Sequence, residues 1–143
     1  MSPGRGGGLG WMSTPLPGTG SLGALTVFVA DLAAEAEFCQ RVLGLPVVFG
    51  DEGSVLFELG GTALNLLRAD RADELVTPAP TTPVTGTAQL LLSLWVHDVD
   101  AVCAQLEERG ATLLNGPVDR PWGKRTAAFA SPAGLAWEVA QDL

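Results

Sequence analysis

Two stretches of the chain repeat one order of apolar and polar positions, and Asp98 in the second lies 67 residues after Asp31 in the first. Each stretch opens with a mostly apolar run, ALTVFV at 24–29 and LLSLWV at 91–96, which leads to the aspartate. Side chains of an extended strand alternate between two faces, and both runs fit that period. The pattern predicts a strand in front of each aspartate.

A helical pattern follows each aspartate. The apolar side chains recur every three or four positions, as Leu32, Ala36, Cys39 and Leu43 in the first half and Val99, Val102, Cys103 and Leu106 in the second. An aspartate carboxylate can cap the free N–H groups of a first helical turn. Gly44 and Gly110 fall where a helix end favours positive φ. We expect a capped helix after Asp31 and another after Asp98.

Each half ends with two further short strands. In the first half, SVLFEL and TALNLL are joined through Gly60 and Gly61. In the second half, RTAAFA and LAWEVA are joined through a Ser-Pro-Ala-Gly turn at 131–134. With a strand after each helix, both halves are predicted to be βαβββ modules. The expected fold class is therefore α+β.

Composition sets the domain limits. Residues 1–20 hold seven glycines and three prolines, which predicts a flexible tail in which either Met1 or Met12 is the true start. We expect one domain over 21–143, with module one at 21–69, a linker at 70–87 and module two at 88–143. The linker is rich in proline and threonine, which suits either a plain connection or a mobile lid.

Charge and hydropathy narrow the class of partner. The formal net charge is −8, which argues against nucleic acid because phosphates would be repelled. No apolar run reaches the roughly 18 residues of a membrane helix, and residues 1–20 lack the apolar core of a secretory signal. We expect a cytoplasmic protein with no membrane partner. Cys39 and Cys103 lack metal-ligand spacing and are expected to be buried free thiols.

Three motifs resemble one known superfamily. VADLAAEAEFCQRVLGLPVVF, SPAGLAWEV and PWGKRTAAFASPAG are similar to segments of the vicinal oxygen chelate superfamily, which includes glyoxalase I, extradiol dioxygenases, fosfomycin-resistance enzymes and bleomycin-binding proteins. The last motif is closest to bleomycin-resistance-type binding proteins. The resemblance implies two tandem modules whose strands form a cup-shaped half-barrel, with the helices outside.

The resemblance also implies four metal-ligand positions, which here hold Ala24, Asn65, Leu91 and Glu138. Ala24 and Leu91 have no donor atom, and one amide with one carboxylate is too small a set for a divalent cation. The single histidine, His97, lies beside the cap and is expected to be exposed or to support it. We predict no metal and no cofactor.

The inner face of the cup is expected to bind a small molecule. Strand alternation sets Ala24, Thr26 and Phe28 on one face, and the resemblance implies that Asn65 and Glu138 point into the cup as well. One of Lys124 and Arg125 should face the cavity or pair with an acid. An inward Glu138 needs a partner, which is either Arg125, as a structural ion pair, or a cationic ligand. The predicted ligand-binding residues are Phe28, Asn65, Ser93, Trp95, Trp122, Arg125 and Glu138. The alternative is that the aromatic residues among them only fill a core.

The function expected from these features is sequestration of a cationic or aromatic antibiotic-like ligand without chemistry, with no catalytic residue. One alternative is an enzyme of the same superfamily, of glyoxalase, lyase or dioxygenase type, that is metal-dependent or uses Glu138 as a base. Another is a partner subunit with an empty cup. Open sheet edges favour a homodimer. The ligand sites then lie either within one chain or at the dimer interface.

Overall fold

The computed structural model describes residues 16–17 and 20–143. Most of the predicted tail, 1–15 and 18–19, lies outside the described residues. Within the described part, no helix is long and apolar enough to cross a membrane.

The first module forms one four-stranded sheet with a helix. Its elements are β1 (Ala24–Val29), α1 (Leu32–Glu37), the π-helical turn η2 (Phe38–Val42), β2 (Val47–Gly50), β3 (Ser54–Leu59) and β4 (Thr62–Arg68). The strand order is β1-β4-β3-β2, with β1 parallel to β4 and the other pairs antiparallel. The Asp31 carboxylate accepts a hydrogen bond from the Ala34 N–H at 3.1 Å, so the predicted cap is formed.

The second module repeats this topology. Its elements are β5 (Leu91–Trp95), α3 (Val99–Glu108), β6 (Thr112–Arg120), β7 (Lys124–Ala130) and β8 (Ala136–Asp142). The order is β5-β8-β7-β6, again with one parallel pair, β5 with β8. The Asp98 carboxylate caps α3 through the Ala101 N–H at 3.1 Å. The predicted α+β fold with two βαβββ modules is confirmed.

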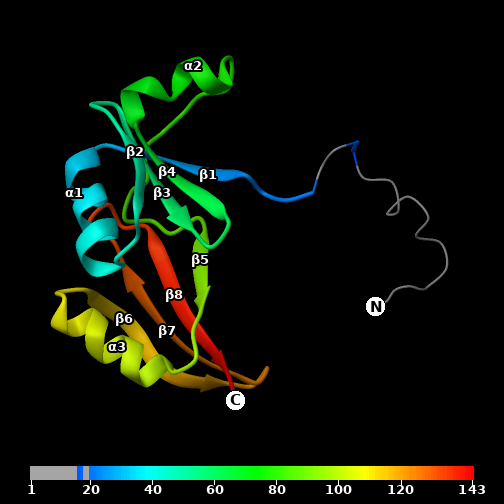
Figure 1. The fold of residues 1–143 in the computed structure, drawn as a ribbon, viewed down its shortest axis with the longest axis vertical. Coiled ribbons are helices and arrows are strands. Elements are labelled where there is room, and N and C mark those ends of the chain that lie inside the picture. The colour runs from blue at the N-terminus through cyan, green and yellow to red at the C-terminus, as the bar shows by residue number, and fades with distance from the viewer. Residues whose placement is uncertain (1–15, 18–19) are drawn as a thin grey trace.

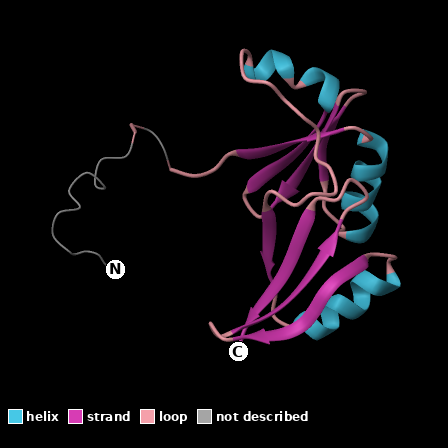
Figure 2. Ribbon diagram, turned by 180° about the vertical axis from the view of Figure 1, so that it is seen from behind, coloured by secondary structure: helices cyan, strands magenta, loops and turns pink. Residues whose placement is uncertain are grey.

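The strands form one layer. The helical segment α1–η2 and helix α3 cover only one side of it (Figure 1 and Figure 2). The core lies between the sheets and these helices. Leu64, Leu66, Trp137 and Val139 are buried on that side. The alternate residues of the same strands point to the other side, which we call the open face. The two sheets do not close into a barrel, so this face is a half-barrel surface.

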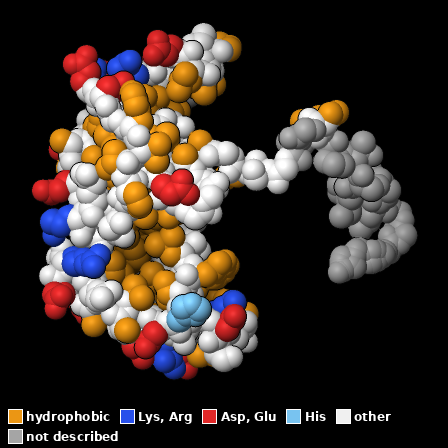
Figure 3. All heavy atoms as spheres, in the orientation of Figure 1, with side chains coloured by type: hydrophobic (Ala, Val, Ile, Leu, Met, Phe, Trp, Pro, Cys, Tyr) orange, Lys and Arg blue, Asp and Glu red, His pale blue; other side chains and the backbone are white. Residues whose placement is uncertain are grey.

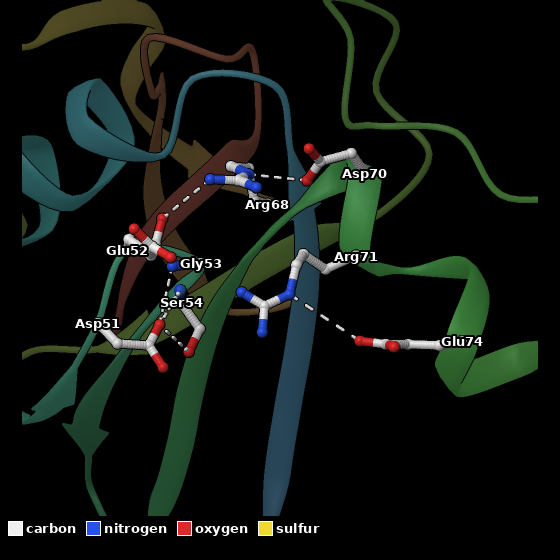
Figure 4. Close-up of polar contacts among 8 residues, drawn as sticks. All are labelled: Asp51, Glu52, Gly53, Ser54, Arg68, Asp70, Arg71 and Glu74. Carbon is white, nitrogen blue, oxygen red and sulfur yellow. Dashed lines mark hydrogen bonds and ion pairs between the residues drawn. The ribbon is translucent and has the colours of Figure 1, made fainter.

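The segment between the modules is anchored at both ends. It starts with the short helices η3 (Ala69–Arg71) and α2 (Asp73–Val76). Figure 4 shows that Arg68 joins Asp70 at 2.7 Å and donates to the Glu52 carbonyl at 3.3 Å, while Asp51 accepts the Gly53 N–H at 2.8 Å. These bonds tie η3 to the β2–β3 turn.

Further along, the segment runs against both sheets. The Val84 N–H donates to the Phe28 carbonyl of β1 at 2.8 Å. The Gly86 Cα would lie 2.7 Å from a Cβ added to Gly134, in the β7–β8 turn. Gly134 has a φ of 90°. Both the close approach and the positive φ require glycine there.

Candidate functional site

Glu138 lies in the middle of the open face of the second sheet. It is the register partner of Ser93 on β5, and the Ser93 hydroxyl donates a hydrogen bond to Glu138 Oε1 at 2.8 Å. The side chains on either side of it along β8, two residues away, are Ala136 and Ala140. No ion pair to Glu138 occurs among the described residues. A half-buried carboxylate with one neutral donor and small neighbours has room to accept a hydrogen bond from a ligand.

Two tryptophans stand at one end of this face. Trp95 ends β5 and is 73 % exposed, and Trp122 lies in the β6–β7 turn and is 67 % exposed. A cation lies over each ring: Lys124 Nζ is 5.0 Å from the Trp95 centroid, and Arg120 Cζ is 5.9 Å from the Trp122 centroid. Each cation restrains its indole and leaves other parts of the ring exposed for stacking.

Lys124 and Arg120 are held by neighbours on the same side of the sheet. Lys124 pairs with its register partner Asp142. Arg120 Nε donates to the buried Thr126 hydroxyl at 2.9 Å, and Arg120 Nη2 reaches Asn115 Oδ1 at 3.3 Å. Sequence reasoning did not identify Arg120, Thr126 or Asn115. The length of the Ser-Pro-Ala-Gly turn sets the register of β7 on β8. From that register Thr126 could have been placed opposite Ala140, on the same face as Glu138.

Arg125 does not pair with Glu138. The register pairs Ala128 with Glu138 and Arg125 with Gln141, so Arg125 points to the helix side. There its guanidinium binds Asp119 at 2.7 Å and Asp100 of α3 at 3.2 Å. The hydrogen bond between Arg125 and Asp119, together with the attraction between their opposite charges, raises the pKa of Arg125 and lowers the pKa of Asp119. Of the adjacent pair, Lys124 faces the open side and Arg125 pairs with acids.

Phe28 and Asn65 lie on the open face of the first sheet. Asn65 is the register partner of Thr26 and donates to its hydroxyl at 3.3 Å, and Phe28 lies opposite Leu67. Both side chains are half-buried. The structure therefore groups Ser93, Trp95, Trp122 and Glu138 on one sheet and sets Phe28 and Asn65 on the other.

The four superfamily ligand positions do not fit a metal ion. Ala24 and Leu91 offer no donor, while the Asn65 amide and the Glu138 carboxylate are bonded to Thr26 and Ser93. In the described part of the chain, no three His, Cys, Asp or Glu side chains converge. His97 is exposed at the end of β5. One amide and one carboxylate at these four positions leave a divalent cation with too few oxygen ligands.

Comparisons with known proteins agree with this fold. A family model described as the Glyoxalase/Bleomycin resistance protein/Dioxygenase superfamily matches residues 21–139. No curated protein sequence matches the chain. A glyoxalase/bleomycin resistance protein/dioxygenase from Nocardioides is 26 % identical, with a TM-score of 0.75 and coverage of 93 % of this chain and 89 % of its own.

Two further solved structures belong to proteins with a named function. TnmS3, an antibiotic binding protein from Streptomyces sp. CB03234, is 28 % identical, with a TM-score of 0.69 over 88 % of this chain and 98 % of its own. A lactoylglutathione lyase from Agrobacterium tumefaciens is 21 % identical, with a TM-score of 0.71 over 87 % of this chain and 95 % of its own. At 21 % identity, the similarity to the lactoylglutathione lyase shows a shared fold and nothing more.

Proposed function

The chain belongs to the glyoxalase/bleomycin resistance protein/dioxygenase superfamily, and we propose that it is a binding protein that sequesters a planar, cationic small molecule on the open face of the second sheet. The observation that carries this proposal is the pair of exposed indoles, Trp95 and Trp122, at the end of a face that also holds Glu138. Among the described residues this carboxylate accepts the Ser93 hydroxyl and has no ion-pair partner. Sequestration needs only tight binding and no reaction.

The chemistry of this face supports such a ligand. Stacking on an indole contributes about 0.5–1.5 kcal/mol beyond the buried area. A cationic group of the ligand would bind Glu138, whose Oε1 already accepts the Ser93 hydroxyl. Lys124 is paired with Asp142, and Arg120 lies at the tryptophan end of the face, over the Trp122 ring. At the centre of the face the charge is that of Glu138, which favours a cation over an anion there.

The comparisons support binding without separating it from catalysis. TnmS3 is an antibiotic binding protein, and its likeness to this chain extends over most of both chains. An enzyme using Glu138 as a general base is the second candidate, because that carboxylate sits on an accessible face with a hydroxyl 2.8 Å away. A metal-dependent enzyme lacks support, since two of the four ligand positions are Ala24 and Leu91.

We also propose that a second copy of the chain completes the cup. Leu91, Leu114 and Val118 of the second sheet and Phe49 of the end strand β2 are exposed. Covering such side chains is favourable at about 25 cal/mol per Å². Sedimentation at micromolar concentration should then give a dimer. The cytoplasmic location and the absence of a nucleic-acid partner stay predictions from composition.

Tryptophan fluorescence tests the binding proposal. Titration with a panel of cationic planar antibiotics and their neutral analogues should quench the emission saturably, with the cationic members binding tighter. The mixtures should then be analysed by mass spectrometry after long incubation. Unchanged ligand supports sequestration, whereas a turned-over product that disappears in Glu138→Gln supports the enzyme. The Trp122→Ala variant is titrated with the same panel. If the native protein binds no member of the panel more tightly than this variant does, the proposed site is wrong.

A further inference from the structure

A second concave site lies on the opposite side of the second sheet. Its groove has a volume of about 200 Å³ between η2, α3 and β5. Figure 3 shows an apolar hollow there, with basic side chains at its edge. The groove is open because α3 packs mainly on β6, β7 and β8. Its apolar walls include Leu43, Leu94, Val102 and Val139, and its polar rim consists of Gln105 and Arg109.

Two arginines link the ends of η2 and α3 next to this groove. Arg109 Nη1 donates to the Val42 carbonyl at 3.0 Å, and Arg41 Nη1 donates to the Arg109 carbonyl at 2.6 Å. Each arginine thus caps the last carbonyls of the other module's helix. Neither forms an ion pair with a described residue. Arg109 therefore places a cation, with no acidic partner among the described residues, at the edge of an apolar groove.

We propose that this groove binds a small apolar carboxylate, with its ring or short tail between η2 and α3 and its carboxylate on Arg109. The groove is somewhat larger than the ~150 Å³ apolar cavity that accommodates benzene in another protein. A guanidinium binds a carboxylate through parallel N–H donors, and such charge-assisted bonds are about twice as strong as neutral ones. This groove shares no residue with the open face. A test of the groove is therefore independent of the proposed function.

Fluorine NMR with 4-fluorobenzoate tests the proposal, and 4-fluorobenzamide serves as the neutral isostere. Both rings fill the groove equally, but only the acid can neutralise Arg109. We expect the benzoate to bind about tenfold or more tightly than the amide, the range expected of a hydrogen bond to a charged group.

The decisive variant is Gln105→Glu. Residue 105 is exposed and lies four positions before Arg109 on α3, the spacing at which an acid pairs with a base on a helix. The new carboxylate should occupy Arg109 and weaken benzoate binding about tenfold while leaving benzamide binding unchanged. Ala104→Glu adds the same charge on the same helix at an exposed position outside the groove, and it should leave both affinities unchanged.

Three results would overturn the proposal. Equal affinity for benzoate and benzamide would show that Arg109 does not anchor the ligand. Equal losses in Gln105→Glu and Ala104→Glu would show only a general charge effect. A benzoate signal that vanishes as protein concentration rises and dimer forms would show that a second copy occupies the groove. Circular dichroism of both variants confirms that each has the native helix content before the titrations are compared.

Discussion

Glu138→Gln separates a ligand-binding carboxylate from a structural one. Glutamine has nearly the same shape and keeps an amide oxygen that can accept the Ser93 hydroxyl, now 2.8 Å from Glu138 Oε1. The substitution therefore removes charge and little else. Because Glu138 has no ion-pair partner among the described residues, the free energy of unfolding should change by no more than about 0.5 kcal/mol.

The loss in affinity for a cationic ligand follows from the same contacts. A hydrogen bond to a charged group contributes about 1.5–3 kcal/mol. Glu138 is half-buried and Oε1 already has a donor, so the lower end of that range applies. At about 1.4 kcal/mol for each factor of ten, a loss of about 1.5 kcal/mol corresponds to roughly tenfold weaker binding. A neutral analogue should bind both proteins equally.

Isothermal titration with matched cationic and neutral ligands measures this difference, and thermal unfolding reports stability in parallel. Glu108→Gln is the control, because it removes one negative charge from an exposed position on α3. It should leave both affinities and the melting temperature unchanged. If Glu138→Gln lowers the melting temperature while every affinity stays the same, Glu138 is a structural residue and the proposed site is wrong.

Three further outcomes test other parts of the structure. Trp122→Ala should weaken an aromatic ligand by about 1 kcal/mol through lost stacking, measured by calorimetry, and an unchanged affinity would remove Trp122 from the site. Arg125→Met should lower the melting temperature slightly and leave ligand affinity unchanged, because Arg125 contacts Asp119 and Asp100 on the other side of the sheet. A loss of affinity would contradict that placement. Burial, together with the nearby Glu35 carboxylate, raises the pKa of the Cys39 thiol to about 12. Mass spectrometry should therefore find Cys39 unalkylated in the native protein at pH 8.5 and alkylated after denaturation. Rapid native alkylation would show that η2 opens.

Local sequence patterns were enough to predict the modules. The aspartate caps, the helical spacing after each and the glycine-containing turns each involve residues a few positions apart, and their recurrence 67 residues later showed that the unit is repeated. Helix caps and strand alternation depend on such local interactions, which explains why the βαβββ topology could be predicted. The position of Glu138 on the open face followed from the resemblance in the SPAGLAWEV segment.

Pairing between distant segments was decided only by the tertiary structure. Alternation within β7 says that Lys124 and Arg125 face opposite ways, but the register of β7 on β8 decides which of them shares a side with Glu138. A shift of one residue would exchange the two. The Lys124–Trp95 contact and the reciprocal bonds of Arg41 and Arg109 likewise join residues far apart in sequence. The first contact depends on how strands pair within the second module, and the arginine bonds depend on how the two modules pack. No local period of the sequence encodes either arrangement.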